Sequence, residues 1–129
     1  MTTLKVGIAD YEQMKARTLA VARGKQRVRR DDPKIWFTSI ESFAKVLSDR
    51  NRALLALIAE TQPDSLAQLS ELSGRAKSNL SRTLKTMERY GLVLLRKGQG
   101  GAIVPHVPYS GIALTVSLGS QGAQAASET

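Results

Sequence analysis

The clearest feature of the chain is a set of helical hydrophobic repeats between residues 48 and 90. Leucine and isoleucine recur there every three to four residues in successive runs, and the first two runs each begin with a serine that can cap a helix. We predict a first helix from Ser48 to about Thr61, a second, shorter helix that begins at Ser65, and a third helix over 76–90. Gly74 marks a tight turn between the second helix and the third.

The hydrophobic pattern changes after Gly91 from a helical period to an extended one. Residues 92–97 and 102–107 are predicted to form two strands, joined by a turn that contains three glycines. Pro105 lacks an amide donor, so we expect the second strand to lie at an edge. Residues 112–118 alternate in the same way and are compatible with a third strand.

The first 47 residues carry weaker signals. Helical spacing predicts a helix over 11–23, and a run of β-prone residues predicts a short extended stretch over 34–37. Thr38 then opens another helix, and Glu41 three residues later completes a capping box. We interpret 1–47 as an N-terminal helical segment that carries the dimer contact, because it brings apolar residues that the following helices do not need.

Charge narrows the range of functions. The 129 residues carry 19 Lys and Arg against 11 Asp and Glu, a formal net charge of +8, so polyanions are the natural partners and nucleic acid is the first of them. No apolar run is long enough to cross a bilayer, and the first ten residues lack the layout of a secretory signal. We therefore expect a cytoplasmic protein with no membrane partner.

The sequence offers no set of groups for catalysis or metal binding. It has no cysteine, and His106 is its only histidine, so neither a thiolate site nor a histidine cluster can form. Asp31 and Asp32 precede a proline and are typical of a turn. We expect a protein that is not an enzyme and that holds neither a metal nor a cofactor.

The basic residues are concentrated around the third predicted helix. Between residues 75 and 97 lie seven basic residues and one acid, Glu88, whereas a helix selected for stability usually mixes the two signs. Arg and Lys can pair with guanine, and Asn can pair with adenine. The predicted DNA-binding residues are Arg75, Lys77, Ser78, Asn79, Ser81, Arg82 and Lys85 at the third helix, and Arg96, Lys97 and Gln99 on the hairpin. A further basic cluster, which is either a DNA-backbone arm or a solvated loop, consists of Arg27, Arg29 and Arg30.

Three stretches of this region resemble a known family. Residues 66–74, Leu-Ala-Gln-Leu-Ser-Glu-Leu-Ser-Gly, and 76–85, Ala-Lys-Ser-Asn-Leu-Ser-Arg-Thr-Leu-Lys, are similar to the helix-turn-helix of MarR-type winged-helix regulators. Gly91-Leu92-Val93 resembles the link into the wing of that family. The resemblance implies backbone contacts from the wing and major-groove contacts from Lys77, Ser78, Asn79, Ser81 and Arg82.

The upstream part resembles a subgroup of short DNA-binding proteins of bacteria and archaea, some of them antitoxin-like autorepressors. The residues that carry this likeness are Val-Gly-Ile-Ala-Asp-Tyr over 6–11 and Trp-Phe-Thr-Ser over 36–39. Two departures from the MarR pattern concern the helix start and the dimer. Ala76 stands where a capping Ser or Thr is common, and the long C-terminal dimerisation helix is missing.

The predicted fold class is mainly α with a small β-wing, an α+β winged helix-turn-helix. It occupies 48–118, after the extra helical segment over 1–47 and before a tail over 119–129 whose Gly, Ala, Ser and Gln predict disorder. We predict a sequence-specific transcriptional regulator, a repressor, that binds double-stranded DNA as a homodimer. The helix 76–90 would contact the major groove, and the wing 92–107 the backbone or minor groove. Two alternatives remain open: an antitoxin that binds a small toxin protein and represses its own operon, and a nucleic-acid-binding protein without sequence preference.

Overall fold

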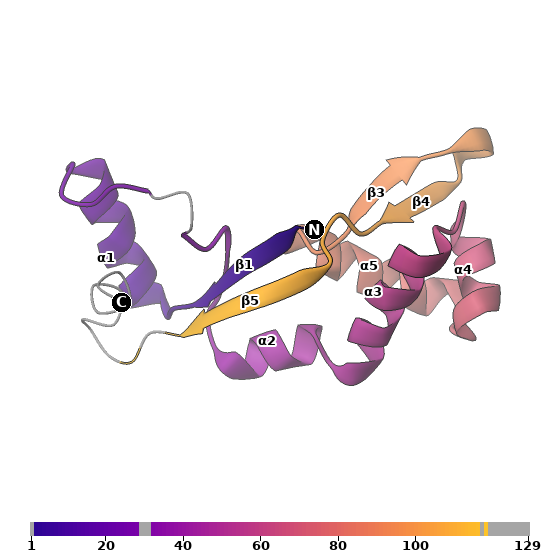
Figure 1. Cartoon of the computed structure of the whole chain (residues 1–129), viewed down its shortest axis with the longest axis horizontal. Helices are drawn as coiled ribbons and strands as arrows, with labels where there is room; N and C mark the ends of the chain where they lie inside the picture. Colours follow the sequence, from indigo (N-terminus) through magenta and orange to yellow (C-terminus); the bar gives the residue numbers. More distant parts are fainter. Residues whose placement is uncertain (1, 29–31, 117, 119–129) are drawn as a thin grey trace. The chain divides into compact units, whose positions relative to one another are not determined.

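The computed structural model describes residues 2–28, 32–116 and 118, and within these residues the chain has an α+β fold (Figure 1). The chain divides into two compact units. Among the described residues, the helical unit consists of Thr2 and 45–111, and the sheet unit consists of 3–28, 32–44, 112–116 and Leu118.

The sheet unit is built on three strands, with β1 in the centre and β2 and β5 on either side of it. Its elements are β1 (Thr3–Ile8), α1 (Tyr11–Ala22), β2 (Ile35–Phe37), the start of α2 (Ile40–Val46) and β5 (Gly111–Val116). β1 and β2 are parallel, with Val6 opposite Ile35 and Ile8 opposite Phe37. Parallel strands need a long crossover between them, and α1 supplies it. α1 starts with a capping box in which Asp10 accepts from the Gln13 amide at 2.8 Å.

Trp36 organises one face of this small sheet. Gly7 is its register partner on β1, and a Cβ placed on Gly7 would lie 2.5 Å from Cζ3 of the indole ring. The guanidinium of Arg17 on α1 lies over the same ring, 5.5 Å from its centroid, and forms an ion pair of 3.0 Å with Asp32. The close approach of ring and backbone therefore requires glycine at position 7.

The helix expected to begin at Thr38 is capped one residue later. The hydroxyl of Ser39 accepts from the amide of Ser42 at 3.1 Å, and α2 runs over Ile40–Val46. The predicted Thr38 and Glu41 capping box was therefore wrong. Phe43 from this helix packs edge-on against Phe37, with ring centroids 5.3 Å apart.

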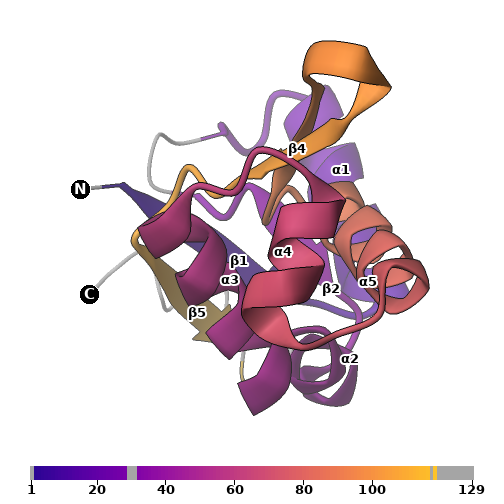
Figure 2. The same ribbon diagram turned by 90° about the vertical axis from the view of Figure 1, so that its right-hand side faces the viewer.

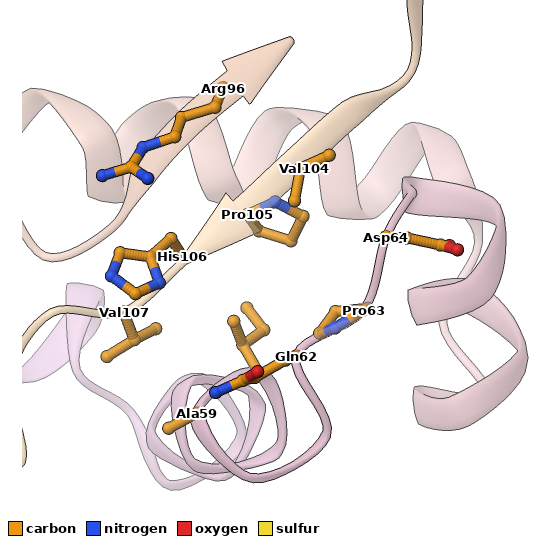
Figure 3. A pocket seen from close by; sticks show the side chains of 10 residues that line it. Ala59, Gln62, Pro63, Asp64, Arg96, Val104, Pro105, His106 and Val107 are labelled. Atoms are coloured by element: carbon orange, nitrogen blue, oxygen red, sulfur yellow. The ribbon is translucent and has the colours of Figure 1, made fainter. Parts of the chain in front are cut away.

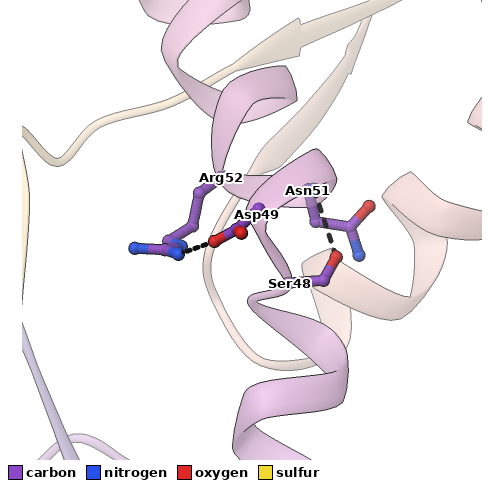
Figure 4. Close-up of polar contacts among 4 residues, drawn as sticks. All are labelled: Ser48, Asp49, Asn51 and Arg52. Carbon is purple, nitrogen blue, oxygen red and sulfur yellow. Dashed lines mark hydrogen bonds and ion pairs between the residues drawn. The ribbon is translucent and has the colours of Figure 1, made fainter.

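The helical unit contains three helices and a β-hairpin, which projects beyond them (Figure 2). Its elements are α3 (Asp49–Thr61), α4 (Leu66–Ser73), α5 (Lys77–Arg89), β3 (Leu94–Lys97) and β4 (Ile103–His106). Both predicted serine caps are confirmed: Ser48 accepts from the Asn51 amide at 3.3 Å (Figure 4), and Ser65 accepts from the Gln68 amide at 3.0 Å. The side chain of Gln68 reaches back to the amide of Asp64 and not to that of Ser65.

The helices bury one continuous set of apolar side chains. The most deeply buried of them in this unit are Ile58, Leu69, Leu80, Leu84, Met87 and Val93. Leu92 and Val93 were predicted as the start of a strand, but they are 2% and 0% exposed and precede β3. Leu72 on α4 is 47% exposed, although it lies at helical spacing from the buried Leu69. The helix boundaries agree with the predicted ones within two residues.

The sheet unit differs most from the prediction. β1 was not predicted, so the segment 1–47 contains two strands of a sheet as well as helices. Residues 111–116 do form a strand, but β5 pairs beside β1 and not with the hairpin. The hairpin therefore has the two strands β3 and β4 alone, and the strand expected within the 48–118 region belongs to the other unit.

Among the described residues, no helix is long and apolar enough to cross a membrane.

Candidate nucleic-acid interface

Helix α5 has two chemically opposite faces. Leu80, Leu84 and Met87 are at most 1% exposed and hold the helix against the core. A helix turns by about 100° per residue, so the side chains opposite this buried stripe follow a spacing of four, three and four. The residues at these positions are all exposed, and they are Ser78, Arg82, Lys85 and Arg89. We call this set the outer face of α5.

The outer face carries three positive charges that form no ion pair within the described residues. The ion pairs found within the described part of the chain join Arg17 to Asp32 and Arg52 to Asp49, and none of them involves α5. Arg82 and Lys85 are three residues apart, and Lys85 and Arg89 are four apart. Like charges at these spacings destabilise an isolated helix by about 0.2–0.5 kcal/mol per pair. An anionic partner bound against the outer face would offset this repulsion, because each of the three cations would attract it.

The turn that leads into α5 is fixed by serine side chains. Gly74 ends α4 with a φ of +74°, a conformation that favours glycine. The Ser70 hydroxyl donates to the carbonyl of Arg75 at 2.7 Å, and Ser73 Oγ accepts from the amide of Arg75 at 3.2 Å. The N-cap of α5, Ala76, has no side-chain hydrogen bond, as the sequence indicated. The first amides of α5 therefore lack a side-chain cap.

Arg75 joins the starts of two helices. Its Nε donates to Asn79 Oδ1 at 2.8 Å, its Nη2 to Thr83 Oγ1 at 3.1 Å and its Nη1 to Asn51 Oδ1 at 3.3 Å. The side-chain nitrogen of Asn51, Nδ2, in turn donates to the carbonyl of Val46 at 2.9 Å. We call Arg75, Asn51, Asn79 and Thr83 the Arg75 network.

The network changes the role of two predicted DNA-binding residues. Arg75 is half-buried, and its donors are used by acceptors within the protein. Its side chain is therefore placed to position its neighbours and not to contact bases. Burial, and to a lesser extent the charge of Arg50, lowers the pKa of Arg75. Asn79 is oriented by Arg75, but its carbonyl oxygen keeps a second lone pair and its NH₂ group keeps its donors.

The remaining predicted residues of α5 flank the outer face. Lys77 is exposed at the first turn, and Ser81 is half-buried beside Leu80. Of the predicted residues, the structure thus brings Ser78, Arg82 and Lys85 onto one face, and Arg89 lies on the same face. Arg89 was not among the predicted DNA-binding residues, although its spacing from Lys85 and Arg82 was a usable signal.

The hairpin presents its basic residues on two different sides. Leu94 pairs with His106, Arg96 with Val104 and Lys97 with Ile103. Successive strand residues point to opposite faces, so Arg96 and Lys97 diverge. Gly100 and Gly101 at the tip have φ values of +65° and +78°, and Gln99 is exposed beside them. The tip is therefore thin, with Lys97 and Gln99 next to it.

A hollow of about 340 Å³ lies between the end of α3 and the hairpin (Figure 3). Gln62 and Pro63 line one wall, and Arg96, Pro105 and His106 line the other. Gln62 caps α3 in the left-handed region, with a φ of +49°. Figure 3 shows Arg96 on β3 above His106, among the residues that line the hollow. The sequence did not predict the hollow, because its walls come from residues more than 30 positions apart.

The upstream basic cluster is described only in part. Arg27 is exposed after α1 in the sheet unit, and Arg29 and Arg30 lie outside the described residues. No group of His, Cys, Asp or Glu that could hold a metal ion occurs within the described ranges.

The comparisons with known proteins concern the helical unit above all. The family model HVO_A0114 matches residues 46–114, which is more than half of the 129-residue chain and includes α3, α4, α5 and the hairpin. Neither a curated protein nor a solved structure matches the chain. On the strength of the family model, the chain belongs to the HVO_A0114 family.

Proposed function

We propose that this chain is a sequence-specific DNA-binding transcriptional regulator, a repressor, whose helical unit is a winged helix-turn-helix of the MarR type. The observation that carries the proposal is the outer face of α5, where exposed basic side chains lie opposite a fully buried stripe. α4 and α5 are the two helices of the motif, Gly74 forms the turn, and the β3–β4 hairpin is the wing.

The dimensions of α5 suit the major groove. Its 13 residues extend over about 20 Å at about 1.5 Å per residue, and the groove admits one α-helix. Residues of the first turns of such a helix contact base edges, which places Ser78 and Arg82 at the bases. Arg82 has the planar fork that pairs with O6 and N7 of guanine. Lys85 and Arg89 lie further along and would bind phosphates.

The Arg75 network supports the same use of α5. A recognition helix must hold its side chains in one geometry, and supporting hydrogen bonds are what hold them. Arg75 orients Asn79 from within the protein, so the Asn79 NH₂ group is presented at the edge of the outer face. The positive charge of Arg75 has no acidic partner within the described residues and adds to the attraction for phosphates.

The hairpin would contact the DNA backbone. Lys97 and Gln99 lie beside a tip of glycines, where the main chain can approach a phosphate closely. Arg96 lines the hollow beside His106 and not the tip, so we assign the contact to Lys97 and Gln99. We further propose that the protein binds as a homodimer, because one such helix covers one half-site and operators are commonly palindromic.

The test is selection of a binding site from random duplexes, followed by titration of the full chain. The dissociation constant is measured by fluorescence anisotropy for the selected duplex and for a scrambled duplex of the same composition, each at two salt concentrations. We expect a preference for the selected site of about 1,000-fold or more, retained at the higher salt. Equal, salt-sensitive affinity for both duplexes would contradict sequence-specific regulation and favour a general nucleic-acid binder. Failure to bind either duplex would refute DNA binding altogether.

A further inference from the structure

β5 is an exposed edge strand with an apolar face. Its six residues, Gly111–Val116, are all exposed, and its one paired neighbour in the sheet is β1. Ile112, Leu114 and Val116 alternate along it and are 36%, 41% and 37% exposed. They share one face of the strand, because side chains two residues apart point the same way. The described chain thus leaves both an apolar face and a row of backbone hydrogen-bonding groups without a partner strand.

This edge lacks the features that protect edge strands. Folded proteins usually shield such edges with charged side chains, proline, a bulge or a very short strand. β2, the opposite edge of the sheet, is only three residues long and follows Lys34. β5 is twice as long and contains no charged residue and no proline. An edge of this kind is typical of a strand that pairs with another chain.

The sequence that follows β5 is poor in large apolar residues. After Val116 the chain continues Ser-Leu-Gly-Ser-Gln-Gly-Ala-Gln-Ala-Ala-Ser-Glu-Thr, in which Leu118 is the one large apolar residue. Leu118 itself is 90% exposed. This composition offers little apolar surface that could match the apolar face of β5.

The strand is complementary to itself. If two copies of β5 pair antiparallel with the two-fold axis at Leu114, then Leu114 faces its own copy and Ile112 faces Val116 of the other chain. On the opposite face, Ala113 would meet Thr115. Every cross-strand pair on the first face is then apolar, and such pairs stabilise antiparallel sheets. A symmetric dimer needs a patch that matches itself in this way.

We propose that β5 is the dimerisation edge of this protein, where a second copy of the chain adds its own β5 and the two sheets join into one. The choice of a second copy rests on the proposed function, because binding to a two-half-site operator requires two α5 helices. This places the dimer contact after residue 110, within the sheet unit that also contains the segment from which a dimer contact was expected.

The absence of cysteine gives a direct test. In the proposed pairing the two copies of residue 114 have Cα atoms about 4.5–5.5 Å apart, within the range of about 4.4–6.8 Å that a disulfide requires. Leu114→Cys should therefore form a covalent dimer under mild oxidation in the full chain without DNA. Leu72→Cys is the matched control, since Leu72 is an exposed leucine of 47% exposure on α4. It should remain largely monomeric on a denaturing gel.

The second measurement is the dimer dissociation constant, determined by sedimentation at several protein concentrations without DNA. Leu114→Lys should raise this constant at least about a hundredfold, because like charges would face each other across the axis. Leu72→Lys should leave it unchanged. A wild-type chain that stays monomeric at tens of micromolar overturns the proposal, as does equal cross-linking at positions 72 and 114.

The two proposals fail in different ways. If the protein dimerises through position 114 but does not prefer a selected DNA site, then the proposed function is wrong and the dimer edge stands. If it prefers a selected site but cross-links no better at 114 than at 72, then the dimer edge is wrong and DNA binding stands. Should Leu114→Lys fail to fold, the cross-linking of the cysteine variants still decides.

Discussion

Replacing Arg75 with alanine should lower the free energy of unfolding of the helical unit by about 2 kcal/mol. This substitution tests directly whether the Arg75 network stabilises the fold. The guanidinium donates to Asn79, Thr83 and Asn51 at 2.8, 3.1 and 3.3 Å. Hydrogen bonds from a charged donor contribute about 1.5–3 kcal/mol each when buried. The side chain is only half-buried and the bond to Asn51 is long, so we discount the sum to about 2 kcal/mol in total.

The assay must report the helical unit. Trp36, the single tryptophan, lies in the sheet unit, so its fluorescence reports the unfolding of that unit and not of the helical unit. Urea unfolding followed by far-ultraviolet circular dichroism monitors mainly α3, α4 and α5, because these three helices contain most of the helical residues, with a smaller contribution from α1 and α2. Arg52→Ala is the matched control, because Arg52 forms an exposed ion pair with Asp49 on α3 (Figure 4). Exposed pairs contribute about 0–1 kcal/mol.

Two further variants isolate the geometry of the guanidinium. Arg75→Lys keeps the charge but loses the planar fork, so it should recover less than half of the lost stability. A double-mutant cycle with Asn79→Ala should give a coupling energy of about 1 kcal/mol. The stabilising role of the Arg75 network is refuted if Arg75→Ala destabilises the protein no more than Arg52→Ala does, or if the lysine variant is as stable as the wild type.

Three other predictions concern the sheet, the core and the hairpin. Gly7→Ala should lower the free energy of unfolding by about 1–3 kcal/mol, because the new Cβ would lie 2.5 Å from the indole ring of Trp36. The change is measured by urea unfolding followed by Trp36 fluorescence. Gly111→Ala is the neutral control, since nothing lies within 4 Å of a Cβ at that position. Leu84→Ala, at a site 1% exposed, should cost about 2–5 kcal/mol in urea unfolding, and a loss below about 1 kcal/mol would argue against the buried face of α5. Lys97→Ala should weaken binding to selected and scrambled DNA alike and reduce the slope of log affinity against log salt by about 0.9, whereas an unchanged slope would remove the hairpin from the DNA contact.

The helices of the helical unit were predictable because their signals are local. Ser48 and Ser65 accept hydrogen bonds from amides three residues away, and Gly74 adopts the left-handed conformation that its position at a helix end requires. Leucines at helical spacing identified the buried faces. Each of these features depends on fewer than ten consecutive residues, so it can be predicted from the local sequence alone.

The sheet was harder to predict because its pairing is not local. β1 is a six-residue strand interrupted by Lys5 and Gly7, and its partner β2 begins 27 residues after β1 ends. The glycine that weakens the strand pattern is the residue that admits Trp36. β5 looked like an extension of the hairpin because it follows β4 closely in sequence, yet its partner is the strand at the other end of the chain.

The candidate interface was predicted in composition but not in detail. The charge and spacing of Arg82 and Lys85 follow from the helical period alone. The positioning role of Arg75 does not, because Asn51 is 24 residues away and the turn between them decides whether the two side chains meet. A basic residue at the start of a helix looks the same in the sequence whether it contacts DNA or supports a neighbour.

The measurement that tests the central claim most directly is the affinity of Arg82→Ala for the selected DNA site. Arg23→Ala is the control, since it removes the same charge from an exposed position after α1 in the sheet unit. We predict that Arg82→Ala loses about 1–3 kcal/mol of binding free energy, or about 5- to 150-fold in affinity, on the selected site and little on scrambled DNA. Its preference at one base pair of each half-site should relax, while Arg23→Ala changes either affinity by less than about twofold. Equal losses for the two variants, or equal losses of Arg82→Ala on both duplexes, would contradict base recognition by the outer face of α5.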